Sequence, residues 1–437
     1  MRSEVARISA NPTSVHISSM LPELPTETWE RAIDYLWNEP ADLRNCALVC
    51  KAWYARSKYH LVATTTLGLR QTTHRFAKLL DTHPQLRARV KVVVVLGTVS
   101  TGETRRPIPH FGTFASMLAG KLPSLGHLGI GNAAWQSGTM HRHVFVHLST
   151  FVNVAGLHLV HVTFPSKIIF GRLVCALPNL RELSCQTLIF RSKDFHPSAL
   201  STTPPRLATL HLDGPSDDVV DLLVRHLRIA GGLQELRAGW VDNRKEATED
   251  YGLSDAIATT LQHTGSELKR AYIRLRLPPA ITPGQGIGEH RQTLTLGQCA
   301  GLEQFAISFC LQKVLAAPSR TPQRLYSLLQ SINSSKLWVV GIRLDTRLID
   351  SIGESEILTL AEEFLEQQRC VLIDEVLSSD SRFASVRYVW VQLMCASGST
   401  SPDHDSWQAT IQTRLPKLHA RRVLSTSVRV WLQDDSF

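Results

Sequence analysis

Three histidines in the run HRHVFVH, namely His141, His143 and His147, are the residues best suited to metal chemistry. Three imidazoles can supply the protein ligands of a zinc site that keeps one position open. In an extended strand all three would lie on one side, together with Phe145, and no acidic residue follows closely. We therefore expect a polar strand face here and no bound metal.

Cys46 and Cys50 lie four residues apart, at a helical spacing that could share a metal ion. No third and fourth ligand stand nearby, and free cysteine commonly behaves as a small buried hydrophobe. The eight cysteines are spread along the chain and are expected to be reduced.

Catalytic templates are absent from the sequence, which has no GxxxxGK[ST], GxSxG, HExxH or CxxC motif. Gly284-x-Gly286-x-Gly288 lies in the run Ile281 to His290 with no strand immediately before it, so we expect a surface loop. Glu362-Glu363 and Asp403-x-Asp405 are interpreted as solvated charges, the latter within a second loop from Ala396 to Ser406. The chain is therefore expected to be no enzyme and to need no cofactor.

Composition indicates a globular chain, since 43% of the 437 residues are hydrophobic and 19% are charged. The net charge of +9 would favour acidic partners, including nucleic acid, but the basic residues form no long run. No leader is apparent in the first twenty residues, and no apolar stretch approaches the length of a membrane span. We expect a protein of the cytoplasm, the nucleus or both.

The elements that could position a function begin with short helices near the amino terminus. Leu24 to Trp37 is predicted as a helix with one apolar face, and a second helical pattern begins at Ala41. About 40 residues are too few to close a core, so something must cover the spare apolar side. The cover is either the rest of the chain or a partner protein.

The order of residues in this segment resembles the F-box family. Leu24-Pro25-x-Glu27 is similar to the opening of the motif, Asp42-Leu43 to its central pair, and Val49-Cys50-Lys51-x-Trp53 to its close. Ala32 stands where the family usually has Ile. The resemblance implies a flexible segment at 1–20, an F-box at 21–61 that binds a Skp-type adaptor, and through it a cullin and a RING protein. The adaptor contacts that it implies are Leu24, Pro25, Trp29, Ile33, Leu36, Leu43, Val49, Cys50 and Trp53.

Past Leu61 the chain repeats an apolar pattern. Leu122-x-x-Leu125-x-x-Leu128-x-Ile130 recurs with its first strand residue at Leu128, Leu157, Leu183, Leu210 and Leu236, in steps of 29, 26, 27 and 26 residues. Similar units follow at Ala271, Phe305 and Val340. The steps are typical of leucine-rich repeats, whose units bury their cores only against neighbours.

The predicted fold is therefore α plus α/β, with F-box helices followed by an irregular leucine-rich-repeat-like solenoid over 62–437. An ordinary α/β domain with leucine-rich strands is the alternative. The whole chain is similar to F-box proteins of mushroom-forming fungi, with Leu415-Pro416-Lys417-Leu418 resembling an element near their end.

In such a solenoid, the residues that alternate with the buried ones face the concave side of the sheet. Arginines concentrate there in the later repeats, where they could bind a carboxylate or phosphate on a substrate, or form a solvated face paired with acids. The candidate substrate-binding residues are His158, His211, Arg237, Arg270, Tyr272, Arg274 and Arg343.

These features predict a substrate-receptor subunit of an SCF-type ubiquitin ligase, with an unidentified protein substrate and no membrane partner. The alternatives are a leucine-rich-repeat scaffold outside any ligase and a basic nucleic-acid binder.

Overall fold

The computed structural model describes residues 25–430, except 38, 98–104, 137, 139, 141–142, 193, 196–199, 201–203, 215–216, 240–251, 277–293, 312–323, 347–352, 368 and 397–400. By its internal contacts the chain divides into two compact units, Met1–Ala63 and Thr64–Phe437. Leu24 and the glycines at 284, 286 and 288 lie outside the described residues. No helix in the described part of the chain is long and apolar enough to cross a membrane.

The first unit, called here the helical unit, contains three short helices: α1 (Thr26–Tyr35), α2 (Pro40–Val49) and α3 (Lys51–Leu61). The helices predicted from the apolar spacing are confirmed. Pro40 is the first residue of α2, a position where the missing N–H costs nothing. Trp29 of α1 and Trp53 of α3 lie with their ring centroids 5.0 Å apart, which joins the first helix to the third.

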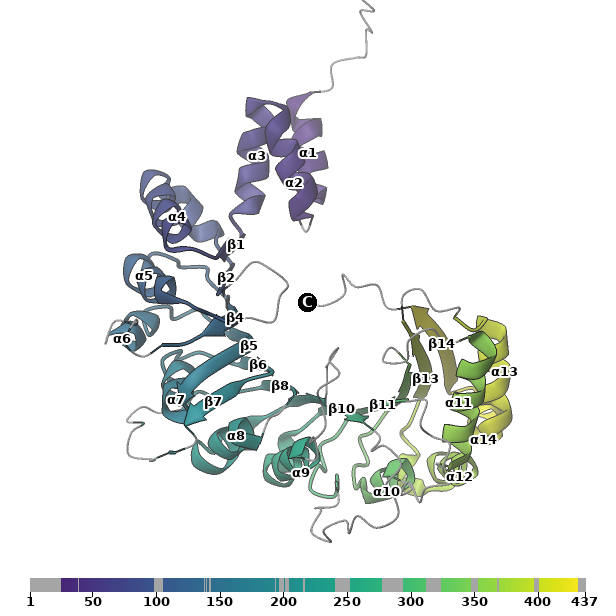
Figure 1. The fold of residues 1–437 in the computed structure, drawn as a ribbon. Coiled ribbons are helices and arrows are strands. Elements are labelled where there is room, and N and C mark those ends of the chain that lie inside the picture. Colours follow the sequence, from purple (N-terminus) through teal and green to yellow (C-terminus); the bar gives the residue numbers. More distant parts are fainter. Residues whose placement is uncertain are drawn as a thin grey trace, which may run out of the picture. The chain divides into compact units, whose positions relative to one another are not determined.

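The second unit, called here the sheet unit, is built on one 14-stranded sheet in which every strand pair is parallel (Figure 1). Two strands stand off the main path, since β3 (Arg106–Pro107) pairs with β4 and β7 (Ile189–Ser192) pairs with β5. The others follow one another in chain order: β1 (Thr64–Leu67), β2 (Val92–Leu96), β4 (His127–Ala134), β5 (Gly156–Ser166), β6 (Glu182–Gln186), β8 (Thr209–Asp213), β9 (Glu235–Gly239), β10 (Arg270–Arg276), β11 (Gln304–Cys310), β12 (Val339–Asp345), β13 (Tyr388–Cys395) and β14 (Leu424–Val430).

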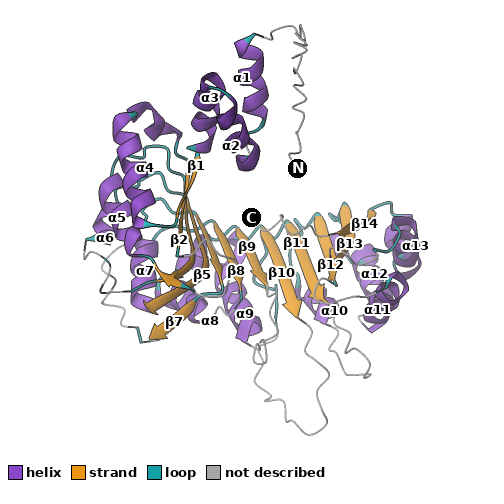
Figure 2. Cartoon of the chain, turned by 45° about the horizontal axis from the view of Figure 1, so that its top comes forward, coloured by secondary structure: helices purple, strands orange, loops and turns teal. Residues whose placement is uncertain are grey.

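The helices of this unit lie on one side of the sheet, and the other side is the concave face (Figures 1 and 2). They connect successive strands as parallel pairing requires, because a parallel connection must cross back over the sheet. Their bounds are α4 (Arg70–Thr82), α5 (Pro109–Leu118), α6 (Val144–Leu148), α7 (Lys167–Cys175), α8 (Asp217–Val220), α9 (Gly252–Thr264), α10 (Arg324–Ser331), α11 (Glu354–Gln367), α12 (Cys370–Ser379), α13 (His404–Arg414) and α14 (Pro416–Ala420).

The repeat found in the sequence sets the register of the sheet. Each apolar position that opens a unit pairs with the next, and the pairing continues past Leu268 without a break. All of these side chains are at most 3% exposed, so they form one continuous core layer between sheet and helices. The paired positions are Leu128, Leu157, Leu183, Leu210, Leu236, Ala271, Phe305 and Val340.

Two local predictions are wrong. The strand expected at His141 to His147 is a helix at its described end, α6, and α13 begins at His404 inside the expected loop. The apolar residues Val144 and Leu148 are buried on one side of α6, so a helical spacing of four was hidden within an alternating run. Asp403 caps α13 by accepting a hydrogen bond from the Asp405 N–H at 3.1 Å, which explains the acidic pair as a helix start.

Candidate functional site

The concave face of the sheet unit carries its polar side chains in rows that cross the strands. One row runs from His158 through Ser184 and His211 to Arg237, and then to Tyr272, because these residues pair in register. A second row, two residues further along each strand, contains Arg274, Ser308 and Arg343. These side chains are among those expected on this face from the sequence, and the strand register aligns them across the sheet.

In the first half of the sheet the concave face is lined by imidazoles. The rings of His127 and His158 lie 5.7 Å apart, centroid to centroid, and Glu182 lies in the same region. Burial lowers the pKa of His158 and that of His211, and the Glu182 carboxylate opposes the shift in both. Both rings are therefore held in the neutral form near neutral pH. Among the described residues, no group of three or more His, Cys, Asp or Glu side chains is arranged to hold a metal ion.

In the second half the concave face carries arginines, most of which are paired with acids. Glu235 accepts a hydrogen bond from Arg237 Nε at 2.6 Å, and its other oxygen lies 3.3 Å from Arg270 Nε. Arg274 donates to Asp345, which is 1% exposed at its side chain. The alternative of a face paired with acids therefore describes Arg237, Arg270 and Arg274.

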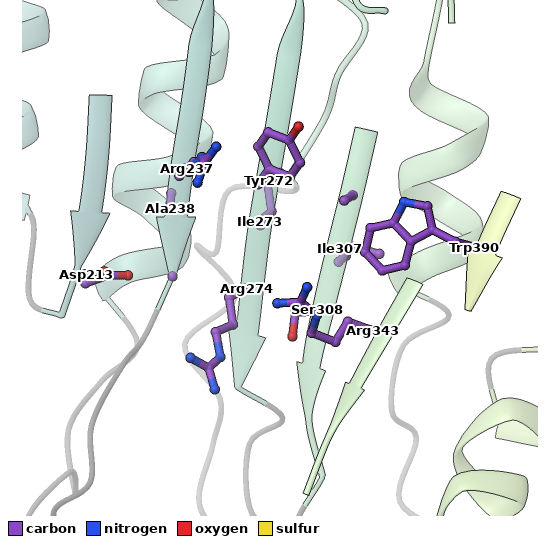
Figure 3. Close-up of a pocket in the computed structure, with 12 residues that line it drawn as sticks. Asp213, Arg237, Ala238, Tyr272, Ile273, Arg274, Ile307, Ser308, Arg343 and Trp390 are labelled. Atoms are coloured by element: carbon purple, nitrogen blue, oxygen red, sulfur yellow. The ribbon is translucent and has the colours of Figure 1, made fainter. Parts of the chain in front are cut away.

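A pocket of about 210 Å³ opens on this half of the concave face, where the six neighbouring strands β8 to β13 contribute to its lining (Figure 3). It brings together Arg237, Tyr272, Arg274 and Arg343 from the predicted set. His158, His211 and Arg270 lie outside it. The lining residues are Asp213, Arg237, Ala238, Gly239, Tyr272, Ile273, Arg274, Ala306, Ile307, Ser308, Arg343 and Trp390.

Two rings form opposite walls of the pocket. Arg237 stacks on Tyr272, with its guanidinium carbon 5.0 Å from the ring centroid, and Arg343 stacks on Trp390 at 5.7 Å. Such cation–π contacts hold both the ring and the guanidinium in place. The pocket therefore offers two aromatic surfaces and cationic groups beside them.

Asp213 and Trp390 are functional candidates that sequence reasoning missed. Trp390 lies on β13, whose alternation of Val389, Val391 and Leu393 is a strand signal outside the repeats identified in the sequence. Asp213 is the last residue of β8. Burial raises its pKa to about 6, although the nearby charge of Arg274 acts to lower it. Nothing in the local sequence of Asp213 indicates that an arginine 61 positions later would face it.

In the helical unit, the residues implied as adaptor contacts fall into two classes. Pro25, Val49 and Cys50 are exposed, Trp29 is 38% exposed, and Leu36 and Trp53 are half-buried. Ile33 and Leu43 are 2% and 1% exposed and pack inside the unit. Large exposed side chains that the resemblance did not include are Tyr35, Trp37, Leu48 and Tyr54.

An ion-pair cluster ties the first helix to the third. Arg56 binds Asp34 through Nε at 2.6 Å and Nη2 at 2.5 Å, and His60 Nε2 lies 2.7 Å from the same carboxylate. The Arg56 guanidinium lowers the pKa of Asp34 to about 2. The cluster fixes the crossing of α1 and α3 by polar contacts where apolar burial is scarce.

Comparison with known proteins gives little. No family model matches the chain, and no curated protein matches it. Among solved structures, the chain is similar to the crystal structure of the Rad7 and Elc1 complex in yeast, with 13% sequence identity, coverage of 94% of this chain and 95% of that chain, and a TM-score of 0.33. The assignment of the sheet unit as an α/β, solenoid-like fold rests on its own strand register.

Proposed function

We propose that the protein is a non-catalytic substrate receptor of an SCF-type ubiquitin ligase. In this proposal the helical unit is an F-box that binds a Skp-type adaptor, and the concave face of the sheet unit, a leucine-rich-repeat surface, binds a protein substrate. The chain would act by proximity, because holding a substrate beside a charged conjugating enzyme raises the effective concentration of the reacting groups.

The observation that carries the proposal is the exposed apolar surface of the helical unit. Six of its large hydrophobic side chains are exposed, by fractions between 38% for Trp29 and 86% for Leu48. Single exposed hydrophobes are ordinary, but many on so short a segment mark an interaction site. The six are Trp29, Tyr35, Trp37, Leu48, Val49 and Tyr54.

The identity of the partner comes from the resemblance of Leu24-Pro25, Asp42-Leu43 and Val49-Cys50-Lys51-x-Trp53 to the F-box. A Skp-type adaptor binds that motif through a helical, mostly apolar interface. Val49 supports this assignment, since it lies in the closing motif and is 62% exposed.

Coprecipitation of the full chain with a Skp-type adaptor and a cullin tests the proposal. The wild-type chain should coprecipitate with the adaptor and the cullin. A Leu48→Asp, Val49→Asp variant should bind neither, because two charges would enter an apolar interface. Val371→Asp, on α12 of the sheet unit, is the matched control, since Val371 is 77% exposed and should tolerate the charge. No binding by the wild type, or equal loss in the control, would overturn the proposal.

A further inference from the structure

The pocket on the concave face has the shape of a slot between two rings. Ala306 of β11 lies between Tyr272 of β10 and Gly341 of β12 in one row. A Cβ at Gly341 would overlap the indole of Trp390, so that ring leans from β13 across the glycine toward Ala306. Figure 3 shows the Tyr272 and Trp390 rings on the two sides of the β11 strand.

Small residues create this slot. Neighbouring strands are about 4.8 Å apart, so the two positions that flank Ala306 are separated by about 10 Å. A flat group in van der Waals contact with a ring on each side needs about 7 to 8 Å. Ala306 supplies a floor that is 6% exposed, and a larger side chain there would fill the gap.

The volume limits what can enter. A dry apolar cavity of about 150 Å³ is large enough for benzene. The 210 Å³ of this pocket is therefore large enough for one ring together with a small polar group.

One end of the slot is polar and lies toward the carboxyl ends of the strands. Arg274, Ser308 and Arg343 are neighbours in one row there (Figure 3). Arg274 Nε and Ser308 Oγ are buried and have no hydrogen-bond partner among the described residues. A buried donor without a partner costs free energy, so an acceptor at this end would be stabilised.

Within the part of the chain that the structure describes, the charged side chains around the slot sum to a small positive value. Four arginines, at 237, 270, 274 and 343, face three acids, Glu235, Asp345 and Asp213. With Asp213 ionised the sum is +1, which balances one negative charge. A carboxylate carries one charge, whereas a phosphate monoester carries nearly two at neutral pH.

We propose that this pocket binds a carboxylate joined to a single flat ring by a short chain, with the ring between Tyr272 and Trp390 over Ala306 and the carboxylate toward Arg274, Ser308 and Arg343. The source is either a free aromatic acid or the terminal residue of a peptide that ends in an aromatic side chain. The peptide source rests on the proposed function, since the pocket would then recognise the carboxyl-terminal residue of the protein substrate.

Calorimetry with the full chain tests the proposal in three arms. The first titrates 3-phenylpropanoate, its neutral amide, and phenyl phosphate as a dianion. The second titrates Gly-Gly-Phe with a free and with an amidated carboxyl end. The free acid should bind at least tenfold more tightly than the amide and than phenyl phosphate, and the stronger of the two acids identifies the source.

The third arm uses matched variants of one row. Ala306→Leu places a side chain in the slot and should abolish binding of 3-phenylpropanoate. Ser184→Leu makes a similar enlargement in the same row outside the pocket and should leave the affinity within twofold. Arg343→Gln should weaken the acid at least tenfold and leave the amide unchanged.

Three results would overturn the proposal: no binding of either acid, equal binding of acid and amide, or unchanged binding by Ala306→Leu with an unchanged melting temperature. Because this assay contains no adaptor, its failure leaves the coprecipitation result standing. Loss of adaptor binding, in turn, leaves the pocket measurement standing.

Discussion

The helical unit and the sheet unit bury their apolar side chains to very different degrees. The structure describes all of residues 26–61 except Asn38. Among these residues, Ile33 and Leu43 are the large apolar side chains that are buried. In the sheet unit every repeat adds a buried position to one layer, from Leu128 to Val340 and beyond. The sheet unit supplies its own core by stacking repeats, whereas the helical unit leaves large apolar side chains exposed.

The largest loss of stability is expected at the centre of the buried layer of the sheet unit. Phe305→Ala removes a side chain that is 0% exposed and pairs in register with Ala271 and Val340. The free energy of unfolding of the sheet unit should fall by about 3 to 5 kcal/mol, from lost burial and the cavity left behind. Denaturant unfolding followed by tryptophan fluorescence measures this.

Adaptor coprecipitation by the folded Phe305→Ala protein should persist, because the change lies outside the helical unit. A loss of less than 1 kcal/mol would show that the layer is loosely packed and would contradict the contrast between the units.

A smaller loss of stability is expected when a buried charged side chain of the sheet unit is replaced. Lys167, 6% exposed, places Nζ 2.9 Å from Asp218 and 3.1 Å from Asp221. Lys167→Met keeps the apolar stem but leaves two partly exposed carboxylates facing each other. We expect a loss of about 1 to 3 kcal/mol in the free energy of unfolding.

Arg225 is the matched control for Lys167, since it approaches the same Asp221 at 3.5 Å with a side chain that is 57% exposed. Arg225→Met should cost less than about 0.5 kcal/mol, because exposed pairs contribute little. Equal losses in the two variants would show that burial does not set the strength of these pairs.

The strand pairing in the sheet was predictable from the sequence because the repeats recur at nearly constant spacing. Leu157, Leu183 and Leu210 open strands at nearly constant steps, and constant steps place like residues side by side. The pocket was only half predictable. Arg237, Tyr272 and Arg343 follow from alternation, but the pairing of Arg274 with Asp345 joins residues 71 positions apart.

The helical unit shows a different limit of sequence reasoning. Apolar spacing located α1 and α2 and therefore the side chains that can be buried. It could not separate Ile33 and Leu43, which face inward, from Leu48 and Tyr35, which are more than 80% exposed. That division depends on how three helices cross, and the Asp34, Arg56 and His60 cluster contributes to the crossing.

Acid should loosen the helical unit through this cluster. The pKa of Asp34 lies at about 2 when folded and at 3.8 in an unperturbed chain, so its stabilising contribution is present above about pH 4 and is lost as the pH falls toward 2. The carboxylate is 36% exposed, so screening by solvent limits the effect to below about 1 kcal/mol.

Hydrogen exchange of α1 and α3 peptides, wild type against Asp34→Asn at the same pH, measures this contribution. The variant should exchange faster at pH 6 and by a clearly smaller margin near pH 2.5, whereas Asp42→Asn, at an exposed site on α2, should match the wild type at both. A difference of the same size at pH 2.5 as at pH 6 would contradict the role of the ionised carboxylate.

The smallest effect on stability belongs to the residue with the largest exposure. Leu48 is 86% exposed, so Leu48→Ser removes little buried surface and should change the free energy of unfolding by less than about 0.5 kcal/mol. The same substitution should weaken adaptor binding by at least tenfold, because a side chain left outside its own core has its apolar contacts in the partner. Chemical denaturation and a titration of labelled adaptor measure the two quantities on one protein. A variant that loses stability without losing adaptor would place Leu48 in an internal core and would remove the contrast between the two units.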